Sequence, residues 1–208
     1  MQNIIQLNEN YNEIPISPQI IKKTDPDTFR IIFSFSKQGT SIFHPHLGIV
    51  EILFMAFIRA GIPVNYSHGF NPLPVLEIAS PLSLGIRARG EIASVDTEGF
   101  FEAEKFKSAM NAFLPEGLEI VDALNVFIPS GKKKYSLSSL LWGFVYSGDN
   151  GTEDTISVKE EKRYRESRLG CEESIYKLER LSVLAEPCAC YFEVYRGLYP
   201  ESGQFQKS

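Results

Sequence analysis

The chain has 208 residues, of which 43% are hydrophobic and 23% charged, and these ordinary globular proportions exclude wholesale disorder. Its formal net charge of -5 argues against a general nucleic-acid binder, because such proteins usually carry a basic surface. The 3 cysteines do not suit a disulfide framework, and the first residues lack the basic start and apolar run of a signal peptide. We therefore expect a cytoplasmic protein.

Six elements are predicted after a polar, irregular N-terminal arm or linker at residues 1–27. Short runs of β-branched and aromatic side chains indicate strands, and longer segments with apolar residues at helical spacing indicate helices. In chain order these are a strand at 30–36, a helix at 46–60, strands at 75–79 and 91–97, a helix at 103–114 and a strand at 118–126. The apolar run within the first helix contains Glu51 and is far shorter than the roughly 20 residues that cross a bilayer, so no membrane is expected.

The order of these elements predicts the fold class α+β, with a ferredoxin-like βαββαβ sandwich over residues 28–130. Residues 131–208 predict a smaller, irregular C-terminal α+β extension, which is a divergent or partial second unit. Its expected parts are a strand at 135–146, a charged segment at 149–170 that is a solvated helix or a mobile loop, a helix at 174–184 and a strand at 190–195.

The loop at residues 65–74 has the most unusual composition in the chain. Ser67, His68 and Asn71 supply hydrogen-bonding groups, Phe70 supplies a stacking face, and two prolines stiffen the segment. It is either a binding loop or a rigid turn whose Phe70 plugs the core and whose polar groups cap the backbone. The residues alone favour the rigid turn.

No complete catalytic or metal-binding motif accompanies this loop. His44 and His46 precede the first helix and His68 follows it, so they are separated by about 20 Å and would not share a metal. There is no nucleophile elbow, phosphate-binding loop or dinucleotide fingerprint, and no cofactor is expected.

Several short motifs nevertheless occur together in a specific order. They are Lys37-x-Gly39, His46-Leu47, Arg59-Ala60-Gly61-Ile62-Pro63, Tyr66-Ser67-x-Gly69-Phe70-Asn71-Pro72, Pro81-Leu82-x-Leu84-Gly85 and Glu91. Over residues 28–127 the chain thereby resembles the radical-SAM-linked protein family, a bacterial domain of unknown function encoded beside, or fused behind, a radical SAM protein. The chain departs from that family at Pro45, Gly48, Leu73 and Ala88, where polar side chains are usual.

The resemblance implies a radical SAM protein as partner. This chain itself lacks the Cys-x-x-x-Cys-x-x-Cys run that holds a radical SAM cluster. We expect the loop to form a ligand- or partner-binding surface, with charged residues from the neighbouring motifs close by. The candidate residues are Lys37, His46, Arg59, Ser67, His68, Phe70, Asn71, Arg87 and Glu91.

Three functions are compatible with these observations. The first is a non-catalytic accessory or substrate-binding module that works with a radical SAM protein. The second is an RNA-binding module in tRNA or rRNA modification, because ferredoxin-like sheets often present aromatic side chains to bases. The third is an enzyme that uses His68 as general acid or base, with Glu91 or Arg87 assisting.

Overall fold

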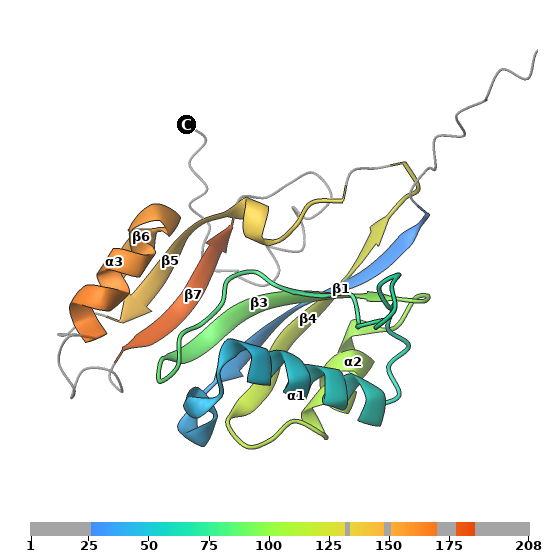
Figure 1. Ribbon diagram of the computed structural model, residues 1–208, viewed down its shortest axis with the longest axis horizontal. Coiled ribbons are helices and arrows are strands. Elements are labelled where there is room, and N and C mark those ends of the chain that lie inside the picture. Colours follow the sequence, from blue (N-terminus) through green and yellow to red (C-terminus); the bar gives the residue numbers. More distant parts are fainter. Residues whose placement is uncertain (1–25, 132–133, 148–150, 170–177, 186–208) are drawn as a thin grey trace, which may run out of the picture.

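A seven-stranded sheet forms the centre of the computed structural model, which describes residues 26–131, 134–147, 151–169 and 178–185 (Figure 1). The elements in chain order are β1 (Thr28–Lys37), a 3-10 turn η1 (Gly39–Phe43), α1 (His46–Arg59), β2 (Leu76–Ile78), β3 (Arg87–Thr97), α2 (Ala103–Asn111), β4 (Leu118–Ile128), a 3-10 turn η2 (Ser138–Leu140), β5 (Leu141–Ser147), β6 (Glu153–Ser157), α3 (Val158–Leu169) and β7 (Glu179–Ala185). The architecture is mixed α+β. No helix within these ranges is long and apolar enough to span a membrane.

The strands follow the order β4-β1-β3-β7-β5-β6, and β2 also pairs with β3. All pairs are antiparallel except β3 with β7, where Arg87 and Ala88 lie opposite Glu179 and Arg180. One edge of β3 is therefore divided between two partners. Its C-terminal half pairs with β2 through residues 93–95, and its N-terminal end pairs with β7 through residues 87–88. Glu91 lies between these two stretches.

Two apolar cores lie on opposite faces of β1, because alternate side chains of a strand point to opposite faces. Phe33 faces α1 and α2, which cover the same side of the sheet, and its ring lies 5.2 Å from that of Phe106 (Figure 1). Ile32 faces a second core that includes Ile92 and Phe144. Both faces of the strand are thus covered along most of its length.

The helix at 46–60 and the strands of residues 28–128 are found close to their predicted bounds, but β3 begins at Arg87 rather than Glu91. The extra residues pair with Lys37 on one side and with β7 on the other. The predicted ferredoxin-like arrangement and the domain boundary near residue 130 stay predictions.

The elements predicted for residues 131–208 differ more from the structure. The helix expected at 174–184 is wrong over residues 179–184, which belong to β7 because β3 and β5 supply hydrogen-bonding partners on both edges, and its residues 174–177 lie outside the described residues. The charged segment at 149–170 contains strand β6 as well as helix α3. The expected strand at 135–146 is shorter and follows η2. The N-terminal arm up to residue 25 and the strand at 190–195 lie outside the described residues.

Candidate functional site

A cluster of charged side chains is buried near Glu91 of β3, between the residues of β3 that pair with β2 and those that pair with β7. The side chain of Arg180, on β7, is fully buried, and Lys37 and Glu91 are each 1% exposed. Charged residues are almost never buried to this degree unless they are paired. Strands β1, β3 and β7 bring the three together although they are far apart in sequence.

Arg180 and Glu91 form a bidentate ion pair. Arg180 donates from Nε to Glu91 Oε1 and from Nη2 to Glu91 Oε2, at 2.7 Å in both cases. The guanidinium carbon also lies 4.8 Å from the centre of the Phe144 ring, a cation–π contact. Burial raises the pKa of Glu91, and the Arg180 charge opposes that rise. Both carboxylate oxygens of Glu91 are therefore engaged, and the guanidinium of Arg180 also packs against an aromatic ring.

A second carboxylate, Glu161 of α3, completes the arrangement around Arg180. Tyr146 on β5 donates its hydroxyl to Glu161 Oε1 at 2.6 Å, and Arg165 Nε lies 2.7 Å from the same oxygen. Arg180 Nη1 is 3.6 Å from it. Burial raises the pKa of the Tyr146 phenol well above its usual value, so the group remains a donor.

Lys37 differs from its neighbours because its ammonium group makes no hydrogen bond to any described residue. Burial lowers the pKa of Lys37, while the charge of Glu91 opposes the effect and that of Arg180 reinforces it. The cluster thus contains three cations (Lys37, Arg165 and Arg180) and two carboxylates, both of which already accept hydrogen bonds.

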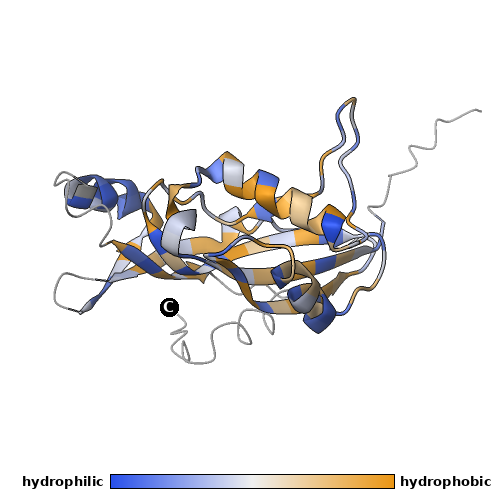
Figure 2. Cartoon of the chain, turned by 90° about the horizontal axis from the view of Figure 1, so that it is seen from below, coloured by the Kyte–Doolittle hydropathy of each residue, from blue (hydrophilic) through white to orange (hydrophobic). Residues whose placement is uncertain are grey.

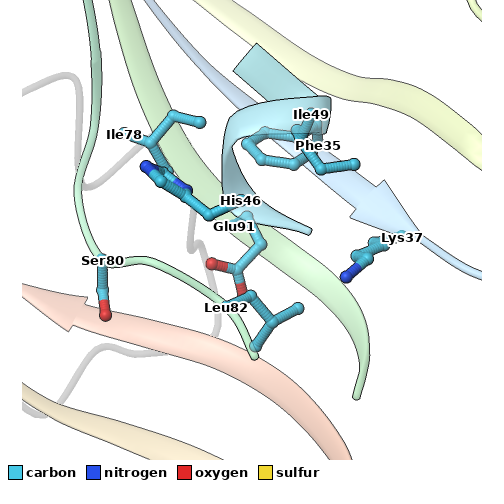
Figure 3. Close-up of a pocket in the computed structure, with 8 residues that line it drawn as sticks. All are labelled: Phe35, Lys37, His46, Ile49, Ile78, Ser80, Leu82 and Glu91. Carbon is cyan, nitrogen blue, oxygen red and sulfur yellow. The ribbon is translucent and has the colours of Figure 1, made fainter. Parts of the chain in front are cut away.

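A cavity of about 10 Å³ adjoins the Lys37 side chain, which is room for about one water molecule. Figure 3 shows the ammonium directed toward Glu91, with His46, at the start of α1, on the far side of Glu91 and next to Ile78. Burial, followed by the nearby Lys37 charge, lowers the pKa of His46, which favours the neutral imidazole. The lining residues are Phe35, Lys37, His46, Ile49, Ile78, Ser80, Leu82 and Glu91.

Of the candidate residues from the sequence, Lys37, His46 and Glu91 meet in this cavity. Arg59 lies on α1 and lines a separate open groove of about 620 Å³. Arg87 is half-buried at the start of β3, opposite Glu179. The expected single surface that joins the loop to Glu91 is therefore not formed, because Glu91 is buried.

The loop residues Ser67, His68, Phe70 and Asn71 are all exposed on a segment that stands out beyond the end of α1 (Figure 2). The prediction that Phe70 plugs the core is wrong, since its side chain is fully exposed. Backbone capping does occur in this loop. Ser67 N donates to Leu73 O at 2.8 Å, and Leu73 N donates to Ser67 Oγ at 3.1 Å.

Sequence reasoning missed Arg180, Glu161, Tyr146 and Ser80. Arg180 and Glu91 are 89 residues apart, and the pair exists only because β7 lies parallel to β3. The segment around Arg180 was expected to be helical, so no pattern indicated an inward-facing arginine. Among the described residues, no group of three or more His, Cys, Asp or Glu side chains is placed to hold a metal ion.

The fold and the cluster define an α+β protein with a buried, charged polar site beside a small cavity. The chain belongs to DUF2344, an uncharacterised protein family conserved in bacteria, whose model matches residues 30–185. The matched range extends past residues 28–127, on which the sequence resemblance rested, and contains every member of the cluster. No curated protein matches the chain.

The unpaired ammonium leads to a prediction about stability. Replacing Lys37 by methionine should raise the free energy of unfolding by about 1 kcal/mol, because a buried charged group that has no hydrogen-bond partner among the described residues is replaced by an apolar chain of similar length. Lys105→Met is the matched control, since that side chain is 75% exposed and its loss should have little effect. Urea unfolding of both variants would measure the difference, and a large destabilisation by Lys37→Met would contradict the expectation.

The same substitution should raise the pKa of His46 toward its ordinary value, because the positive charge that disfavours imidazolium is removed. The lowered pKa also implies that this histidine costs the folded state stability as the pH falls below the unfolded pKa of about 6.5. NMR titration of the 3 histidines would follow the shift, with the exposed His68 as internal reference. An unchanged His46 titration in Lys37→Met would show that the two groups do not interact.

Proposed function

We propose that this protein is a binding module that works with a radical SAM protein and has no catalytic centre of its own. The observation that carries the proposal is the state of the buried cluster. Arg180 donates hydrogen bonds to both carboxylate oxygens of Glu91, and Tyr146 donates its hydroxyl to Glu161. These groups are therefore engaged with one another rather than available for proton transfer to a substrate. The Lys37 ammonium, which is buried without a hydrogen-bond partner among the described residues, suits the binding of one anionic group of a substrate, which a partner then transforms.

Two structural features weigh against the other candidate functions. His68 is exposed and lies outside both cavities described above, whereas Glu91 is buried, so the two would not act on one substrate. RNA recognition by a ferredoxin-like sheet needs an open sheet face. Here Ile32 and Ile92 are buried under a second core, which leaves β1 and β3 covered on that side.

The partner is suggested by the sequence resemblance, and the shape of the loop at 65–74 supports a protein contact there. Its tip presents Phe70, and Leu73 beside it is 55% exposed. Large apolar side chains that stand out from a surface in this way are typical of protein interfaces.

We further propose that residues 28–130 form a ferredoxin-like unit and residues 131–208 a smaller second unit. The strand order β4-β1-β3-β2, with every pair antiparallel and both helices on one side, supports the first assignment.

Affinity purification of the tagged chain from its own host, followed by mass spectrometry, tests the proposed partner. We expect a radical SAM protein in stoichiometric amount with the wild type, and its loss with Phe70→Ser. Phe100→Ser is the matched control, because Phe100 is also highly exposed but lies between β3 and α2. A wild-type bait that carries no radical SAM protein would refute the partnership.

A further inference from the structure

We infer that the cavity beside Lys37 binds the carboxylate of a small organic molecule, an inference that rests on the proposed binding function and names its ligand class. The clearest indication is the Lys37 ammonium, which is buried, lies against the cavity and has no hydrogen-bond partner among the described residues. Buried charges are normally paired, because an uncompensated one is costly in a medium of low dielectric constant. A bound anion would supply the missing partner.

The surrounding charges favour an anion over a cation. Both oxygens of Glu91 accept hydrogen bonds from Arg180, so this carboxylate already has a cationic partner before any ligand arrives. Glu161 faces Tyr146, Arg165 and Arg180 and does not line the cavity. The net charge next to the cavity is therefore positive, and Lys37 carries it.

Two further side chains add hydrogen-bonding capacity at the cavity wall. Ser80 Oγ lies 3.4 Å from Arg180 Nη1 and accepts from it, which leaves its own hydroxyl proton free to donate. His46 also lines the cavity and is only half-buried. A neutral imidazole there can donate one N–H to an anionic oxygen.

The volume of the cavity and the polarity of its walls indicate which class of anion it can accept. The free space of about 10 Å³ matches one water molecule, so a carboxylate oxygen fits it better than a tetrahedral phosphate does. The remaining walls are apolar and offer no competing polar partner; they are formed by Phe35, Ile49, Ile78 and Leu82. Because the free space is filled by one oxygen atom, the rest of the ligand would lie outside the cavity.

Thermal unfolding of the full chain in sodium propionate, inorganic phosphate or sodium chloride at equal ionic strength tests the inference. A ligand that binds only the folded state raises Tm with its concentration. We expect propionate to raise the Tm of the wild type and of Lys105→Met beyond the effect of chloride. In Lys37→Met the apparent affinity should fall about tenfold or more, as for loss of a charged hydrogen bond.

Each alternative outcome is decisive. A Tm that rises with phosphate but not with propionate would overturn the carboxylate assignment. A propionate-dependent rise in Tm that persists in Lys37→Met would place the anion elsewhere. If that variant does not fold, NMR of the ¹⁵N-labelled lysine side chains in the wild type gives the answer. The Lys37 signal should then shift on addition of propionate, and an unmoved signal would refute the site. Partner capture is measured without propionate, so failure of one proposal is distinguishable from failure of the other.

Discussion

Arg180→Met is expected to lower the free energy of unfolding by about 3–5 kcal/mol, the range found when one partner of a buried ion pair is removed. The loss arises because Glu91, 1% exposed, would lose both of the 2.7 Å hydrogen bonds that compensate its burial and would stay buried without its cationic partner. The substitution also removes the contact of the guanidinium with the Phe144 ring. Urea unfolding monitored by circular dichroism would measure the effect.

A neighbouring ion pair between the same two strands supplies the control. Arg89 Nε lies 2.8 Å from Glu179 Oε1, but the Arg89 side chain is 66% exposed, so Arg89→Met should cost less than about 1 kcal/mol. Adding Glu91→Gln to Arg180→Met should restore part of the stability, because an uncharged amide is less costly to bury than an unpaired carboxylate. If Arg180→Met and Arg89→Met were equally mild, burial would not be what makes the Arg180 pair strong.

Gly117→Ala is the second change expected to have a large effect, a destabilisation of about 3 kcal/mol. Gly117 has φ of 87°, a left-handed conformation, and an added Cβ would lie 2.3 Å from the backbone oxygen of Gln38. The contact cannot relax easily, since Gln38 N donates to Gly117 O at 2.7 Å. This link holds the end of β1 just after Lys37, so the turn before β4 positions the candidate site.

The expected loss at Gly117 has two contributions, the strain of a left-handed backbone and the contact of the new Cβ with Gln38. Gly61→Ala separates them. Gly61 also has a positive φ, of 63°, but an added Cβ there would meet no atom within 4 Å. We expect a loss of only about 1 kcal/mol, from backbone strain alone. Thermal or urea unfolding of the two variants side by side would measure the difference, and equal losses would show that the approach to Gln38 is not rigid.

The predicted gain in stability for Lys37→Met has a bearing on function. If replacing Lys37 stabilises the fold, the contribution of Lys37 to stability does not explain its presence. Natural proteins retain destabilising residues chiefly at functional sites. Arg180 and Gly117 are expected to behave in the opposite way, because they build the frame around the cavity. The three substitutions together therefore distinguish Lys37, the residue proposed to bind, from the residues that position it.

The amino-acid sequence by itself determined the local elements of residues 28–128 and part of the candidate site. The helical spacing of Ile49, Leu53 and Phe57 and the β-branched and aromatic run of β1 depend on neighbouring residues, so their periodicity is readable along the chain. Lys37, His46 and Glu91 were found through short motifs, which identified them without saying that they meet.

The tertiary structure alone decided how the site is built. Strand β7 takes its conformation from long-range pairing with β3 and β5, which outweighs local propensity, and its residue Arg180 reaches Glu91 only through that pairing. Whether a polar loop packs or protrudes depends equally on contacts remote in sequence, which is why Phe70 was misplaced. Burial is a property of the assembled fold, and burial distinguishes Lys37, which has no hydrogen-bond partner in the part of the chain that the structure describes, from an ordinary surface lysine.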